Sequence, residues 1–115
     1  MAPRVVDPAL LPVQALPGRR IVEAFADHGV TLRLVDLPPA EPRTPHEHTE
    51  VAECMVVLAG KGQVWVAGET APVHAGDAIL VPAATPHMVL NTGSDVLKLA
   101  CFFPTADVAA SYVQH

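Results

Sequence analysis

The sequence has few basic residues, and its N-terminal segment lacks an uninterrupted apolar stretch. Seven Lys and Arg stand against twelve Asp and Glu, a formal net charge of −5, whereas binding to a phosphate backbone needs clustered basic side chains. The first twelve residues are interrupted by Pro3, Pro8 and Pro12, so they lack the continuous apolar stretch of a signal peptide or membrane span. We therefore expect no nucleic-acid partner, no membrane partner and a cytoplasmic protein.

Cysteine and aromatic residues are also scarce. The two cysteines, Cys54 and Cys101, form no CxxC pair and are too few for a disulfide framework, so we interpret both as reduced thiols in the core. Although 50% of the residues are hydrophobic, the aromatic residues are only three Phe, one Trp and one Tyr, so aliphatic packing must dominate. Residues 1–115 are expected to form a single domain.

The first third of the chain is predicted to form an extended arm followed by strands. The proline-rich residues 1–20 predict an extended arm with one short edge strand. Residues 19–29 fit a helix or a strand, and we favour the strand. In residues 30–37 Val30, Leu32 and Leu34 alternate with polar residues, which is typical of a half-buried strand.

Short apolar runs then alternate quickly with Gly, Asn and Asp turns, and no long helical pattern lies between them. This spacing predicts an all-β antiparallel sandwich or barrel. Near the end of the chain, Thr105 or Asp107 could cap one short helix formed by the sequence VAASYV.

Four side chains suited to a metal ion stand between these turns. His46 and His48 are two residues apart, so they share one face of an extended strand. Glu53 lies at an odd offset from His48, so the chain must turn between residues 49 and 52. Three imidazoles, with His87 as the third, and one carboxylate suit a divalent transition metal and leave one or two coordination positions free.

Two segments of the chain resemble a known family. The segment HEHTEVAECMVVLAG, residues 46–60, resembles the first motif of the cupin superfamily, and GDAILVPAATPHMVLN, residues 76–91, is similar to the second. The resemblance covers residues 30–104. It implies a double-stranded β-helix, which is a small jelly-roll barrel, with His46, His48, Glu53 and His87 as the metal ligands.

Two positions depart from the cupin pattern. Ala40 and Ala84 stand where the pattern has glycine, and the glycine at the second position permits a turn that an L-residue dislikes. Because alanine is the smallest side-chain-bearing residue, we expect the backbone to adjust locally and the fold to be kept.

Other polar residues compete for roles at the site. Glu50 shares strand parity with His46 and His48, but the motif spacing favours Glu53 as the carboxylate ligand. Asn91 is expected to cap the NTGSD turn. The remaining histidines are expected in turns or on the surface: His28, His74 and His115.

The function implied is that of a metal-dependent enzyme acting on a small organic molecule. We favour a dioxygenase, with iron or manganese as the metal and nickel, cobalt or zinc as alternatives. Glu53 could dissociate and serve as a base. Met55, Trp65 and Phe103 are interpreted as core residues, some of which would line an apolar pocket beside the metal.

Two alternatives remain open: a non-redox isomerase, lyase or cyclase, and a non-catalytic metal- or ligand-binding module. The first lacks support because a carboxylate substrate would need an Arg or Lys and residues 102–113 contain neither. Arg43 is the basic residue nearest the site in sequence, and we interpret it as a solvated loop charge.

We also expect a homodimer. A barrel of this size leaves a sheet edge open, and the N-terminal arm carries apolar residues that could add to a partner's sheet. These residues are Val5, Val6, Leu10 and Leu11.

Overall fold

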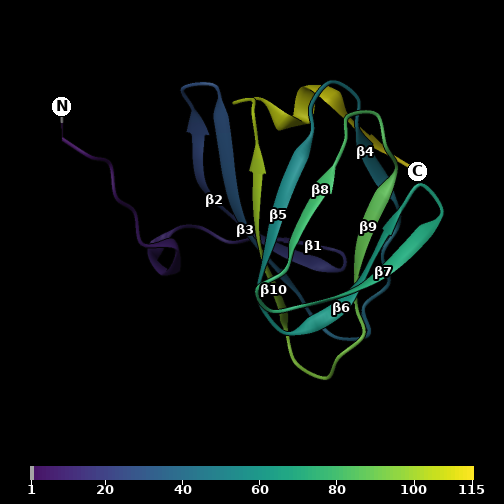
Figure 1. Ribbon diagram of the computed structural model, residues 1–115. Helices are drawn as coiled ribbons and strands as arrows, with labels where there is room; N and C mark the ends of the chain where they lie inside the picture. The colour runs from purple at the N-terminus through teal and green to yellow at the C-terminus, as the bar shows by residue number, and fades with distance from the viewer. Residues whose placement is uncertain (1) are drawn as a thin grey trace.

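A computed structural model describes residues 2–115, which form two antiparallel sheets that face each other (Figure 1). One sheet has six strands in the order β1-β2-β3-β10-β5-β8, and the other has five in the order β11-β4-β9-β6-β7. The strands are β1 Gln14–Leu16, β2 Arg19–Asp27, β3 Val30–Leu37, β4 His46–His48, β5 Glu53–Ala59, β6 Lys61–Val66, β7 Glu69–His74, β8 Ala78–Val81, β9 His87–Asn91, β10 Leu97–Phe103 and β11 Tyr112–Gln114. This architecture confirms the predicted all-β jelly roll.

The core lies between the two sheets and is mostly aliphatic. Strands β5 and β10 alternate buried and less buried residues along most of their length, as a period of two requires when one face packs inward. The buried residues include Leu37, Val57, Val81 and Leu97, each no more than 1% exposed. Aliphatic side chains therefore provide most of the packing, as the composition indicates.

Strands β2 and β3 confirm the strand predictions for residues 19–29 and 30–37, but the inner face of β3 is the opposite of the one expected. Thr31, Val35 and Leu37 are buried, while Leu32 and Leu34 lie on the outer face and are only partly covered. Thr31 tolerates burial because its hydroxyl donates to the carbonyl of Thr105 at 2.7 Å. Both faces of β3 carry apolar residues, so alternation alone could not choose between them.

The cysteines differ in burial. Cys101 on β10 is buried, in agreement with the expectation, whereas Cys54 on β5 is exposed. Cys54 lies between two inward-facing residues, Glu53 and Met55, so strand alternation places it on the outer face. The expectation of two core thiols is therefore wrong for Cys54.

The two ends of the chain contain the only helical turns among residues 2–115, both of them 3-10 segments. η1, Pro8–Leu10, lies in the N-terminal arm before β1, which is the edge strand of the larger sheet. η2, Val108–Ser111, forms part of the expected C-terminal helix, and the chain then extends into β11. None of the helical segments described has the length and apolar character needed to span a bilayer.

The loops near the site hold two alanines in the left-handed backbone region. Ala40 has φ of 59° and Ala84 has φ of 57°, the positions where the cupin pattern has glycine. The expected local adjustment of the backbone does not occur, since both alanines keep the conformation that glycine would adopt. An L-residue there is strained by about 1–2 kcal/mol. The Ala84 N–H compensates in part by donating to the His48 carbonyl at 2.8 Å.

Candidate metal centre

Strands of both sheets deliver the four predicted ligands to one place. His46 and His48 lie on β4 and His87 on β9, in the five-stranded sheet, while Glu53 begins β5 in the six-stranded sheet. His46 and His87 are direct partners in the β4–β9 ladder, which brings their rings to 4.3 Å between centroids. Residues 49–52 make the turn that brings Glu53 to the same side as His48.

The four side chains form one buried cluster. One ligand atom from each of the four residues lies within 4.8 Å of the others, and all four residues are buried. Glu53 Oε1 is 2.9 Å from His87 Nε2 and 3.6 Å from His48 Nε2. The spacing leaves room for a single shared cation between the imidazoles and the carboxylate.

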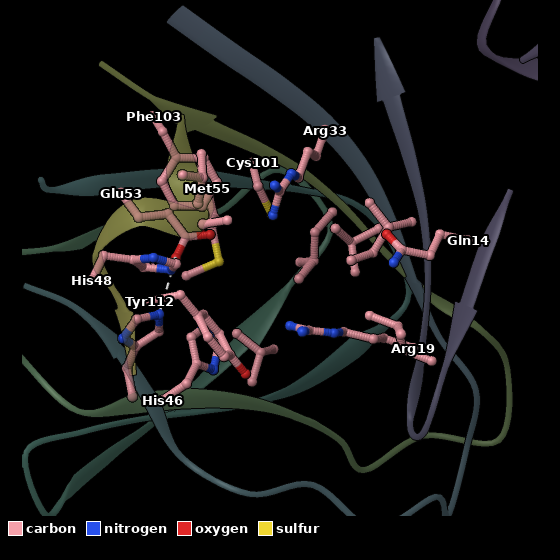
Figure 2. Close-up of a pocket in the computed structure, with 18 of the residues that line it drawn as sticks. Gln14, Arg19, Arg33, His46, His48, Glu53, Met55, Cys101, Phe103 and Tyr112 are labelled. Atoms are coloured by element: carbon pink, nitrogen blue, oxygen red, sulfur yellow. Dashed lines mark hydrogen bonds and ion pairs between the residues drawn. The ribbon is translucent and has the colours of Figure 1, made fainter. Parts of the chain in front are cut away.

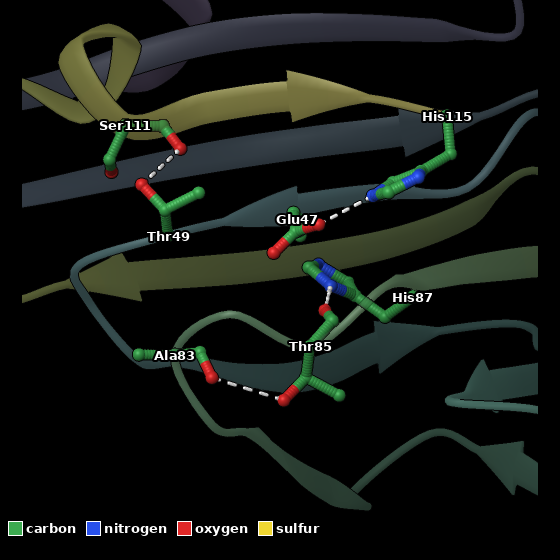
Figure 3. A network of polar contacts seen from close by, with 7 residues as sticks. All are labelled: Glu47, Thr49, Ala83, Thr85, His87, Ser111 and His115. Carbon is green, nitrogen blue, oxygen red and sulfur yellow. Dashed lines mark hydrogen bonds and ion pairs between the residues drawn. The ribbon is translucent and has the colours of Figure 1, made fainter.

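The hydrogen bonds of His87 fit such a cation. Its Nδ1 lies 2.9 Å from the Thr85 carbonyl oxygen, which can only accept, so Nδ1 carries the proton (Figure 3). Nε2 of the neutral ring is then a lone pair directed at the Glu53 carboxylate. A positive ion between the two groups satisfies both, and the carbonyl contact is the usual outer support of a ligating histidine.

His48 is the second residue whose surroundings suit a bound metal ion. Its Nε2 is buried and finds no hydrogen-bond partner among the described residues. A buried nitrogen without a partner costs about 1–3 kcal/mol, and coordination to a metal removes that cost. The ring itself is held edge-on by Phe103, with 4.7 Å between centroids. The donor set therefore fits a divalent transition metal.

The surroundings set the charges of the cluster. Burial alone would raise the pKa of Glu53, but the adjacent imidazoles of His48 and His87 outweigh it and lower that pKa to about 2. Burial first, and then the proximity of His87, lowers the pKa of His46 to about 3. At neutral pH the cluster thus offers a carboxylate and a neutral His46 imidazole, the protonation states that metal binding requires.

The C-terminal strand supports the strand that carries His46 and His48. β11 pairs with β4, placing Tyr112 opposite His48 and Gln114 opposite His46. Figure 3 shows two contacts that fix this pairing: Thr49 donates its hydroxyl to the Ser111 carbonyl, and the His115 ring meets Glu47 at 2.6 Å. Glu47 thus points away from the cluster, between two residues that point into it.

The other polar candidates lie outside the cluster, as expected. Glu50 is exposed and is absent from the group of converging ligands, whereas Glu53 belongs to it. His28 is exposed in a turn, and exposed His74 contacts Asp77 at 2.6 Å. Asn91 ties its turn together by donating to the carbonyls of Leu37 and Asp95 and accepting from the Gly93 N–H.

A cavity of about 280 Å³ opens beside the four ligands. Met55 and Phe103 line it, as the sequence indicates. Trp65 does not, because its neighbour Val64 faces the core and alternation turns Trp65 to the other side of β6. Buried Cys101 also lines the cavity; burial and the charge of Glu53 raise the pKa of its thiol well above the ordinary value, so it stays neutral.

Three arginines that sequence reasoning did not connect with the site line the same cavity: Arg19, Arg33 and Arg43. Arg43 is partly buried and donates to the Val89 carbonyl at 3.2 Å, so its interpretation as a solvated loop charge is wrong. Figure 2 shows Arg19 and Arg33 reaching into the cavity from the side opposite His46, His48 and Glu53. The reversed inner face of β3 explains why Arg33 was missed.

Comparison with known proteins identifies a family and several relatives. A family model described as a cupin domain matches residues 33–103, more than half of the chain. A protein of uncharacterised function from Aquifex aeolicus is 35% identical over 63 residues, 55% of this chain and 52% of that protein. The oxalate oxidase GF-3.8 of Triticum aestivum is 26% identical over 93 residues, 74% of this chain and 42% of the relative. The chain spans about half the length of the curated relatives it matches.

Among solved structures, a predicted oxalate decarboxylase from Thermotoga maritima superposes with a TM-score of 0.82 at 18% identity. The match covers 89% of this chain and 99% of that one. At this identity the likeness establishes the fold alone.

Proposed function

Because this chain belongs to the cupin domain family, we propose that it is a metal-dependent enzyme acting on a small organic molecule, and specifically a dioxygenase. One observation carries the proposal: four buried ligands converge on the wall of a cavity large enough for a small molecule. Four protein ligands leave one or two positions open, the feature that distinguishes a catalytic metal site from a closed structural one.

The residues around the cavity support substrate binding in a water-poor site. Fe(II) or Mn(II), when bound, would act as a Lewis acid towards a substrate oxygen and supply the redox chemistry that dioxygen needs. Met55, Leu99 and Phe103 provide apolar walls that exclude water from the reacting atoms. Glu53, ionised at neutral pH, is placed to accept a proton from a substrate hydroxyl.

Oxygen consumption tests the proposal. The metal-free protein would be loaded anaerobically with Fe(II) or Mn(II) and mixed with a panel of small enols, diols and hydroxy acids. We expect dioxygen uptake with at least one compound, lost in Glu53→Gln and kept in Glu50→Gln, which alters an exposed carboxylate of the same type. Uptake that survives Glu53→Gln would contradict the role of this carboxylate, and no uptake across the panel would contradict the dioxygenase.

A non-redox isomerase, lyase or cyclase is the second candidate, and the arginines favour it. Residues 102–113 contain no basic partner for an acidic substrate, whereas Arg19, Arg33 and Arg43 line the cavity. Proton NMR of anaerobic mixtures distinguishes the two reactions. Substrate loss without dioxygen would support this candidate, and strict dependence on dioxygen would support the first.

We also propose that the protein forms a homodimer through its N-terminal arm. Val5, Leu10 and Val13 are 86%, 82% and 61% exposed, an apolar surface that association would cover. Light scattering of a variant lacking residues 2–13 should give the mass of a monomer, where the full chain gives that of a dimer. A dimer that persists without the arm would place the interface elsewhere.

A further inference from the structure

The end of the cavity opposite the metal ligands is positively charged. Arg19 begins β2, Arg33 lies in the middle of β3, and Arg43 belongs to the loop before β4, yet all three line one cavity. Figure 2 shows the side chains of Arg19 and Arg33 directed into this space and towards the metal ligands. Three separate segments thus bring cations to one place.

The protein itself leaves these charges incompletely paired. Arg19 forms no ion pair and donates no side-chain hydrogen bond within residues 2–115, although it lies 6.0 Å from the centre of the Tyr112 ring. Arg33 has one carboxylate near it, Glu23 at 3.6 Å, and its Nε is buried without a partner. By contrast Arg20, the neighbour of Arg19, donates to two carbonyls and pairs with Glu41.

The cavity as a whole therefore carries more positive than negative charge. Among the described lining residues, Glu53 is the one carboxylate against three guanidinium groups, and a divalent metal would add two further positive charges. Burial first, and then the positive charge of Arg19, lowers the pKa of Arg43 from its ordinary value. Like charges that line one cavity repel one another. An anionic ligand would relieve this opposition.

We infer that the substrate is a small organic acid whose carboxylate is bound by Arg19 and Arg33, with its reacting end at the metal ligands. The inference rests on the proposed function and names its substrate class. A guanidinium holds a carboxylate through two parallel hydrogen bonds, which orients the ligand as well as attracting it. Val35, Met55 and Leu99 line the same cavity and offer an apolar wall that fits a short carbon chain.

Calorimetric titration of a dicarboxylate series tests this inference without turnover. The probes are oxalate, malonate, succinate, glutarate and adipate, with neutral glutaramide as the uncharged match for glutarate and inorganic phosphate as the competing anion. Each is titrated into Mn(II)-loaded and metal-free protein. We expect at least one dicarboxylate to bind the loaded protein about tenfold or more tightly than glutaramide, a difference of about 1.4 kcal/mol.

Variants assign the binding to the arginines. Arg19→Gln and Arg33→Gln should each weaken the best dicarboxylate about tenfold, and Arg19→Lys should weaken it less because the charge remains. Arg20→Gln removes the same charge from the neighbouring residue, which does not line the cavity, and should leave affinity within about twofold. Circular dichroism confirms that each variant is folded.

The metal-free titrations separate this inference from the proposed function. Residual dicarboxylate binding that still depends on Arg19 supports the carboxylate site even if no reaction is ever found. Equal affinity in wild type and Arg19→Gln, tighter binding of phosphate than of every dicarboxylate, or no binding of any dicarboxylate to the loaded protein would each overturn it.

Discussion

The two ends of the cavity differ in how they satisfy their polar groups. At the metal end the four ligands come from three strands, with His87 held by the Thr85 carbonyl and His48 by the Phe103 ring, and together they suit one shared cation. At the arginine end Arg19 of β2 and Arg33 of β3 present positive charges that suit an anion. The two ends of the cavity therefore suit ligands of opposite charge.

This difference indicates that one end of the cavity binds a metal and the other binds the ligand. The metal end is a compact cluster in which each residue depends on the others, so a single substitution should have a large effect on metal affinity. At the arginine end the side chains are less buried and their like charges repel one another. Removing one of these charges should therefore weaken ligand binding without lowering the stability of the fold. Substitutions at each end can test whether this contrast is real.

The largest effect is expected at the metal end. His46→Ala and His87→Ala each remove a ligand from the buried cluster and should lower Mn(II) affinity roughly 100-fold or more, measured by competition with a chelator. His74→Ala is the control, because this histidine is exposed and lies outside the cluster. Equal metal affinity in His74→Ala and His87→Ala would contradict the assignment.

Acid should destabilise the metal-free protein through the same cluster. His46 has a folded pKa of about 3 against 6.5 ordinarily, so below pH 6.5 the unfolded chain binds a proton that the folded chain does not. The free energy of unfolding should then fall as pH falls, approaching about 1.4 kcal/mol per pH unit. Glu53 acts in the same direction below pH 4.5, because its folded pKa is about 2.

Urea titrations of chelator-treated protein from about pH 7 to about pH 5 measure this slope. His46→Gln, which cannot take up the proton, should show a shallower dependence over the same range. If wild type and His46→Gln gave equal slopes, the acid sensitivity would come from other groups.

At the arginine end the sign of the stability effect should reverse. Arg19→Met removes an unpaired cation from beside Arg43 and replaces it with an apolar side chain of similar length. The ligand-free protein should gain about 1 kcal/mol in free energy of unfolding. Arg20→Met, which breaks existing hydrogen bonds, should lose stability. If Arg19→Met lowered the free energy of unfolding, Arg19 would already have favourable partners in the ligand-free protein. The proposed difference between the two ends would then be wrong.

Sequence alone predicted the metal end because its signal is local. His46 and His48 are two apart on one strand, and Gly60 and Gly76, which end and begin the two motifs, adopt φ of 88° and 96° that favour glycine. Each of these features depends on a few neighbouring residues. The resemblance of these two motifs to the cupin pattern therefore implied the jelly-roll fold and the four ligands without knowledge of how distant strands pair.

The arginine end depends on strand faces and pairing, which the sequence leaves ambiguous. In β3 the face bearing Val30, Leu32 and Leu34 has more apolar residues than the face bearing Arg33, yet the second face is the inner one. β3 lies between β2 and β10, and its outer apolar residues pair with Val22 and Phe102 on the outer surface. Arg33 shares one face of the strand with Val35 and Leu37, and this shared face was the sequence feature that could have placed Arg33 on the inner side.

The smallest effect concerns Ala84, where the sequence departs from the cupin pattern. Its φ of 57° strains an alanine, and its N–H holds the loop before His87 to the His48 carbonyl. Ala84→Gly should relieve the strain, and after the larger entropy of an unfolded glycine is subtracted the gain should be about 0.5–1 kcal/mol.

Urea unfolding measures this gain, with Ala83→Gly as the matched control. Ala83 is the adjacent loop alanine and does not have a positive φ, so glycine there should only destabilise. Mn(II) affinity should stay within about twofold in Ala84→Gly, because the loop keeps its hydrogen bond to β4. A stability gain accompanied by weaker metal binding would instead mean that the rigid alanine positions His87, and strain in this loop would then belong to the metal end of the cavity.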